Sequence, residues 1–334
     1  MNYKILIIIL LFSQITQPFV SYYLLKRDGK YILILGDRHS KAITAINEYH
    51  TEIFIHSIEL HTLKKPIPFI MESGFNDNSP PVSESVSQKI DDNHSRDITA
   101  RSLYEYFSKH KTILDLIYYD IRESITFILS LILEELDTFI AHNNASDLFD
   151  FEAFKEAIPY STEDTLKQYI TYLDTSYANI QNWLKNSDPN TLEYKEIYEL
   201  SEQFFKRREV IINLLCGTQP EDNLDAFVIN TFKECKTIEE VNIASSRVLD
   251  YMFNTDVYLA DIGFLQKLIA VQSNHPKALF VTGHSHATNT AESLQRIGYT
   301  LISCKHSKPH EDFINNIRHI MLIFLMSKSV GQQQ

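Results

Sequence analysis

Runs of apolar residues, each ended by a glycine or a polar residue, mark the strands predicted along the chain. The first run is Tyr31–Leu35, which ends at Gly36, and the second is Pro66–Met71, which ends at Glu72. Continuous apolar runs of this length are typical of strands that are buried on both faces of a parallel sheet. Three later runs have the same pattern, at residues 113–119, 278–282 and 299–303.

Helical periodicity fills most of the chain between these runs. Helices are predicted at residues 40–60, 99–110 and 290–296 and at the C-terminus, and a long loop is predicted at 74–98. From about 123 to 272 the pattern is almost entirely helical; Ile170, Leu173 and Tyr177, for example, share one face. The order predicts an α/β fold with a mixed or mostly parallel central sheet flanked by helices. A long all-helical insertion, at about 123–272, would separate the N- and C-terminal halves of the sheet.

The first residues have the pattern of a targeting segment. Lys4 precedes an apolar run, Ile5–Phe12, which is short for a membrane span but typical of a secretory signal peptide. Residues 1–22 are therefore predicted to be a signal peptide or an uncleaved membrane anchor, and residues 23–334 a single domain. A buried first strand is the weaker interpretation, because a strand already begins at Tyr31. The protein is expected to be exported: periplasmic, secreted or membrane-anchored, with membrane contact only through an uncleaved leader.

Composition narrows the possible partners and the kind of fold. The 334 residues include 31 basic and 43 acidic side chains, and a net charge of -12 argues against a general nucleic-acid binder. Three cysteines cannot build a disulfide scaffold, although Cys216 and Cys235 could pair after export. Only 8 of the 334 residues are glycine, a share well below the average glycine content of about 7%. Each glycine therefore indicates a place where the backbone turns or is closely approached.

Two similar motifs carry the candidate chemistry. Gly36-x-x-His39 follows the first predicted strand, Gly283-x-x-His286 follows a later one, and each precedes a predicted helix. Glu72 directly follows the second strand. The carboxyl ends of strands in an open α/β sheet form the ligand-binding edge, so these residues are expected to meet there. Two imidazoles and a carboxylate can hold a metal ion, or can serve as a general base with its orienting partners.

Secondary candidates are the polar residues beside these motifs and after the third strand: Asp37, His284, Asp120 and Arg122. Asp37 could cap the helix that follows it, orient His39 or bind a metal. Asp120 and Arg122 favour a structural ion pair, but their position at the same edge keeps them as candidates. No motif surrounds the histidines of the tail, which are His306, His310 and His319.

These motifs resemble the EreA/ChaN superfamily, which includes erythromycin esterases, the ChaN haem-iron-binding lipoproteins and the TraB/PrgY and TIKI proteins. The resemblance rests on the segments Gly36-Asp37-Arg38-His39, Glu72, and Gly283-x-x-His286 with Leu294 and Gly298-Tyr299 after it. It implies a site core of His39, Glu72 and His286, with Asp256 as a secondary candidate. Asn254 and Thr255 stand where the superfamily often has a basic residue.

The resemblance implies an exported hydrolase, metalloprotease-like or esterase-like, that acts on a peptide or a small-molecule ester. His39, Glu72 and His286 would activate water, and they would also be the ligands of a divalent metal ion if the reaction needs one. One alternative is a non-catalytic protein of the ChaN type that binds haem or a metal. Another is an interaction protein on a degenerate enzyme fold, which the Asn254-Thr255 departure favours.

Overall fold

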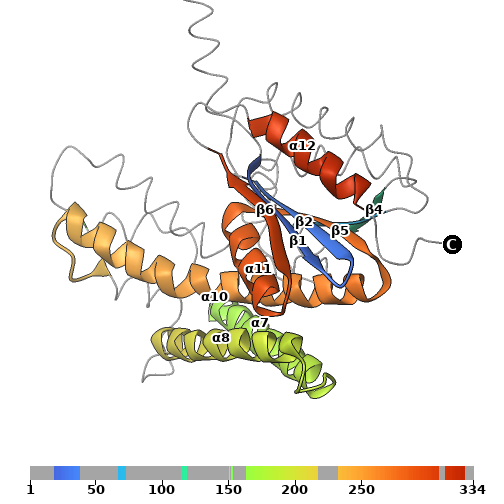
Figure 1. Ribbon diagram of the computed structural model, residues 1–334. Coiled ribbons are helices and arrows are strands. Elements are labelled where there is room, and N and C mark those ends of the chain that lie inside the picture. The colour runs from blue at the N-terminus through green and yellow to red at the C-terminus, as the bar shows by residue number, and fades with distance from the viewer. Residues whose placement is uncertain are drawn as a thin grey trace, which may run out of the picture. The chain divides into compact units, whose positions relative to one another are not determined.

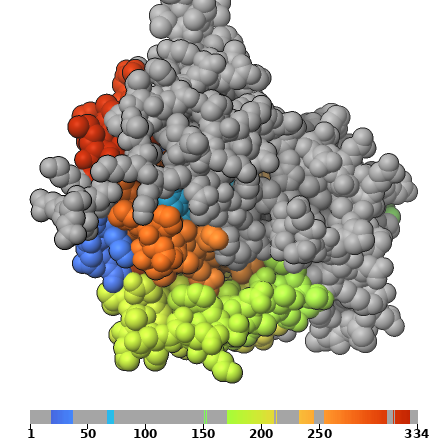
Figure 2. All heavy atoms as spheres, turned by 90° about the vertical axis from the view of Figure 1, so that its right-hand side faces the viewer, coloured from blue at the N-terminus to red at the C-terminus, as the bar shows by residue number. Residues whose placement is uncertain are grey.

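The structure is a computed structural model of the chain. It describes residues 19–37, 67–72, 114–118, 150, 152, 163–216, 232–307 and 313–327, which are coloured in Figure 1; Figure 2 shows one face of the molecule in a space-filling view. The chain forms two compact units. The first unit comprises Met1–Gly74, Asp91–Asp120 and Gly263–Gln334, and the second comprises Phe75–Ile90 and Ile121–Ile262. The second unit overlaps the helical insertion expected from the sequence.

A six-stranded sheet, ordered β4-β3-β5-β2-β1-β6, forms the centre of the first unit. The strands are β1 (Phe19–Arg27), β2 (Lys30–Asp37), β3 (Ile67–Met71), β4 (Leu114–Tyr118), β5 (Lys277–Gly283) and β6 (Thr300–His306). Strands β4, β3, β5 and β2 run parallel to one another, whereas β1 is antiparallel to both β2 and β6. The predicted α/β fold with a mixed, mostly parallel sheet is confirmed.

Strand β1 is the main difference from the sequence prediction. It begins at Phe19, so the predicted end of the leader at residue 22 falls inside a strand that is paired on both sides. A two-residue turn joins β1 to β2, and both of its residues have positive φ, Asp28 at 49° and Gly29 at 75°. Asp-Gly with two positive φ angles is a strong hairpin signal, because this turn matches the twist of the strands. This strand was not predicted; residues 1–18, which include the apolar run Ile5–Phe12, lie outside the described residues, and export stays a prediction.

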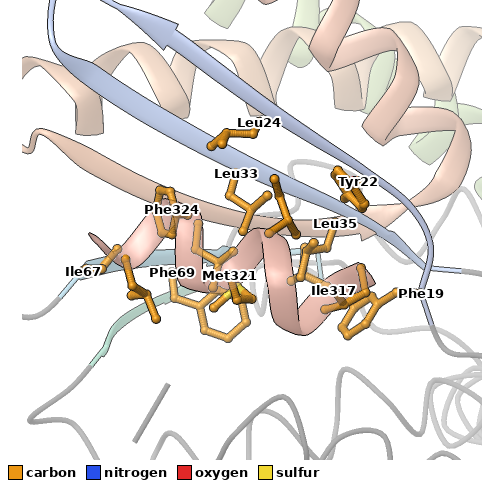
Figure 3. Close-up of a cluster of buried hydrophobic side chains, with 14 of the residues drawn as sticks. Phe19, Tyr22, Leu24, Leu33, Leu35, Ile67, Phe69, Ile317, Met321 and Phe324 are labelled. Atoms are coloured by element: carbon orange, nitrogen blue, oxygen red, sulfur yellow. The ribbon is translucent and has the colours of Figure 1, made fainter. Parts of the chain in front are cut away.

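Helix α12 (Phe313–Met326) covers one face of the sheet and completes the main hydrophobic core. Alternate residues of the strands point to the same face, and most of those facing α12 in β1, β2, β3 and β5 are apolar. Figure 3 shows Ile317, Met321 and Phe324 of α12 lying over this face. The core residues labelled there from the strands are Phe19, Tyr22, Leu24, Leu33, Leu35, Ile67 and Phe69.

Helix α11 (His284–Arg296) covers the opposite face of the sheet (Figure 1). It begins at the residue after β5. A Cβ atom at Gly36 would overlap Oγ of Ser21 and would lie 3.1 Å from Cβ of Ala287 and 3.2 Å from Cα of His284. Glycine is therefore required in β2 because α11 approaches the strand closely, and not because the backbone turns there.

The end of α11 has the Schellman geometry that glycine favours. Gly298 has a φ of 97°, and its N–H donates to the carbonyl of Gln295 at 3.0 Å. The N–H of Tyr299 donates to the carbonyl of Leu294 at 2.9 Å. These two bonds satisfy carbonyls that would otherwise lack partners at the end of the helix.

The second unit is helical as far as it is described. It contains α7 (Glu163–Lys185), α8 (Leu192–Cys216) and the first part of α10 (Ile238–Asn274), whose remaining residues belong to the first unit. The rings of Tyr177 on α7 and Phe205 on α8 lie 5.0 Å apart. No described helix is long and apolar enough to cross a bilayer. The helices predicted at 40–60 and 99–110 and the loop at 74–98 lie outside the described residues.

Candidate functional site

The carboxyl ends of three neighbouring parallel strands meet at one edge of the sheet. In β2 and β5, Asp37 pairs with Gly283. Glu72 follows Met71, the last residue of β3, which pairs with Val281 of β5. Strand β5 lies between β3 and β2 although it is the last of these three strands in sequence. Ligands of open α/β sheets bind at such an edge, close to the point where the strand order reverses.

Strand β5 holds the carboxylate of Glu72 in a fixed orientation. The hydroxyl of Thr282 and the N–H of Gly283, at 2.7 Å, both donate to Oε2 of Glu72. The N–H of Glu72 donates to the carbonyl of Val281 at 2.9 Å, so the β3 backbone is also tied to β5 at this point. Glu72 is only 8% exposed. A buried carboxylate with two donors on one oxygen has little freedom to rotate.

His286 lies beside the other oxygen of that carboxylate. Its Nε2 is 3.7 Å from Oε1 of Glu72, and the edge-on ring of Phe264 lies 5.5 Å away, centroid to centroid. His286 is in the first turn of α11, on the face of the helix that is buried. The structure therefore brings together two of the three residues expected to form the site core.

The remaining candidates are distributed differently. Asp37 is buried, but alternation along β2 groups it with Leu33 and Leu35, which face α12, whereas Glu72 contacts Thr282 on the α11 face. Asp256 is buried within the part of α10 that belongs to the second unit. Three candidates lie outside the described residues: His39, Asp120 and Arg122.

Thr282 and Phe264 are contact residues that the sequence analysis missed. Thr282 was counted as the last residue of an apolar strand, and its position directly before the Gly-x-x-His motif was the available signal. Phe264 lies within a long helical pattern, and nothing in that pattern separates it from other core residues.

His284 belongs to a second polar cluster. Its Nδ1 lies 2.8 Å from Oγ of Ser21 on β1, and its ring centroid is 5.4 Å from that of His306 on β6. Burial lowers the pKa of His284, and the neighbouring His306 lowers it further. No sequence motif points to a role for His306, because its contacts depend on β1, the strand that was not predicted.

Metal binding at the Glu72–His286 pair can be tested against its geometry. Two ligands that bind one zinc ion with bonds of about 2.1 Å at a tetrahedral angle lie about 3.4 Å apart. The observed 3.7 Å between Oε1 of Glu72 and Nε2 of His286 is close to this separation. Within the described part of the chain, no group of three or more His, Cys, Asp and Glu side chains is arranged to hold a metal ion. His39, the third predicted ligand, lies outside that part.

Comparisons with family models, curated proteins and solved structures found no match to this chain. The resemblance to the EreA/ChaN superfamily therefore stays a prediction.

Proposed function

We propose that the chain is a hydrolase in which the Glu72–His286 pair activates water for attack on the carbonyl carbon of a peptide or ester. The observation that carries the proposal is the anchored carboxylate: Oε2 of Glu72 accepts two hydrogen bonds, and Oε1 faces the imidazole of His286. A buried acid–imidazole pair at the carboxyl edge of an α/β sheet is a typical general-base arrangement.

In this reaction His286 takes a proton from water as the water oxygen attacks the carbonyl. Glu72 stabilises the imidazolium that forms, because its negative charge is already fixed beside the ring. The same proton then passes to the leaving amine or alcohol. His39 would assist from the neighbouring strand, since it follows β2 by two residues and the end of β2 is paired with the end of β5.

The start of α11 supports the negative charge that develops on the carbonyl oxygen. Its N-cap residue is Gly283, so no N-cap side chain occupies the first N–H groups of the helix. N–H groups at a helix start favour an anion, and they stabilise a developing oxyanion where they point into a site. If a divalent metal ion is needed, Glu72 and His286 supply two of its ligands, and the ion would lower the pKa of a bound water.

The test compares the wild-type protein with Glu72→Gln and His286→Ala on panels of chromogenic esters and peptides, with and without added Zn²⁺. Both variants should lose about 100-fold or more in kcat, the range typical of a lost general base. His319→Ala is the matched control, because His319 is an exposed histidine on α12, and it should keep full activity. Circular dichroism would verify that each variant is folded.

Full activity in both site variants would contradict the proposal. A haem titration tests the main alternative: a stable coloured complex that is lost in His286→Ala, with no turnover of any substrate, would favour the binding protein. Neither turnover nor binding of haem or metal would favour the interaction protein.

A further inference from the structure

A second pair of histidines lies on the α11 face of the sheet, outside the Glu72–His286 pair. His284 is the first residue of α11 and His306 is the last residue of β6. Their ring centroids are 5.4 Å apart and their planes are at 83°. Strand β1 joins them, because Ser21 bonds His284 and is also the residue paired with His306.

The hydrogen bonds around Tyr23 determine which nitrogen of His306 carries a proton. The hydroxyl of Thr288 donates to the carbonyl of His284 at 3.1 Å. A hydroxyl has one proton to donate, so Thr288 must accept from the hydroxyl of Tyr23, 2.8 Å away. The oxygen of Tyr23 can then only accept from Nε2 of His306, at 3.3 Å. In this arrangement of protons, neutral His306 is protonated on Nε2, and Nδ1 has an unshared electron pair.

His284 is held in a complementary way. Oγ of Ser21 lies 2.8 Å from its Nδ1, and in the tautomer in which Nδ1 donates to Ser21, Nε2 is the nitrogen that can bind a ligand. The neutral imidazole is the form that binds metal ions. Hydrogen bonding of the second ring nitrogen is also how metal-binding histidines are usually oriented.

The distance between the rings fits one shared ion. Two imidazoles bound to zinc with bonds of about 2.1 Å at a tetrahedral angle have ring centroids about 5 Å apart. The observed 5.4 Å is close to this value. Perpendicular ring planes are compatible with a shared ion, because each ring can rotate about its own metal–nitrogen bond.

We propose that His284 and His306 form a second site that binds a divalent transition-metal ion such as Zn²⁺, through Nε2 of His284 and Nδ1 of His306. Imidazole nitrogen is a preferred ligand of zinc, copper and nickel. His306 is exposed on an edge strand, so the ion can enter from solvent. No third His, Cys, Asp or Glu completes the site within the described residues, so water fills the other positions and the ion is exchangeable.

The experiment is a calorimetric titration of the full chain with Zn²⁺ alone. Zinc is preferred to copper as the probe because Cys304, two residues from His306, is a free and exposed thiol that would react with Cu²⁺. Loss of a residue that only orients a ligand already costs about 10-fold to 100-fold in metal affinity. His306→Ala removes a ligand itself and should weaken zinc binding at least tenfold, whereas the exposed His319→Ala should bind as the wild type does.

The site is independent of the proposed hydrolase, and one further variant separates them. His286→Ala should lose hydrolysis but keep zinc binding at His284 and His306. Zinc affinity and stoichiometry unchanged in His306→Ala would overturn the proposal, and so would an equal loss in His319→Ala. Because His306 is exposed on the edge strand of the sheet, its replacement leaves the hydrophobic core intact. A loss of zinc binding in His306→Ala therefore reports on the ligand and not on unfolding.

Discussion

Replacing Gly36 by alanine tests how tightly α11 is held against the sheet. The new Cβ would overlap Oγ of Ser21 and would meet Cβ of Ala287 at 3.1 Å and Cα of His284 at 3.2 Å. One of these neighbours is backbone and another is a Cβ atom, so neither can rotate away. Overpacking of this kind costs about 1–3 kcal/mol, and we expect Gly36→Ala to lose about 2 kcal/mol of unfolding free energy.

The variant Ser21→Ala divides that cost between its sources. On its own it removes the hydrogen bond to His284, worth about 1 kcal/mol. In the double variant the overlap with Ser21 is gone, and only the contacts at 3.1 and 3.2 Å remain to be relieved. The double variant should therefore be more stable than the sum of the single effects predicts, by at least about 1 kcal/mol.

Urea unfolding followed by circular dichroism measures the three variants and the wild type under the same conditions. A Gly36→Ala protein within about 0.5 kcal/mol of the wild type would refute the close approach of α11. Strictly additive free energies would show that Ser21 is not the residue that excludes a Cβ atom at position 36.

Three further predictions concern single positions. Thr282→Val should lower the unfolding free energy by about 1.5–3 kcal/mol, because it removes a donor to the buried carboxylate of Glu72. The matched control, Thr290→Val, should be neutral or stabilising in the same urea assay, because the Thr290 hydroxyl is buried without a hydrogen-bond partner. Hydrogen bonds from the backbone N–H groups of Lys236 and Thr237 lower the pKa of Glu240. The Glu240 carboxylate therefore stabilises the start of α10 fully at pH values above its unfolded pKa of about 4.3, and this stabilisation is lost as the pH falls through the lowered folded pKa. Glu240→Gln should speed amide exchange at the first turn of α10 at pH 7, and a difference from the wild type that persists at acid pH would contradict this. Gly298 has a φ of 97°, so Gly298→Ala should lower the unfolding free energy by about 1–2 kcal/mol and the melting temperature with it. An unchanged melting temperature would argue against the left-handed conformation at the end of α11.

The sequence predicted the parts of the fold that depend on local pattern. Continuous apolar runs located β2, β3, β4, β5 and β6, and helical periodicity located α7. Strand β1 was missed because its apolar residues followed a leader-like segment, which offered a competing explanation for them. The Asp28-Gly29 pair was the signal that could have reversed this, since it predicts a hairpin with the strand that follows.

The candidate site was predictable only in part. The position of Glu72 after a buried strand and the Gly283-x-x-His286 motif were enough to expect that the two side chains meet at one edge. Strand order and helix placement decide the rest. Thr282 contacts Glu72 because β5 lies next to β3, and His306 approaches His284 because β1 lies between β2 and β6; no local pattern encodes either arrangement.

The position of β1 has a consequence for the order in which the protein can fold. The hairpin of β1 and β2 can form as soon as both strands have left the ribosome, but the other edge of β1 pairs with β6. The contact between Tyr23 and His306 spans 283 residues of sequence. Until β6 has been synthesised, β1 presents an unpaired edge, which is a template for aggregation. Addition of β6 to the sheet is therefore a late folding step that depends on non-local contacts. A chain truncated before β6 keeps the outer edge of β1 unpaired.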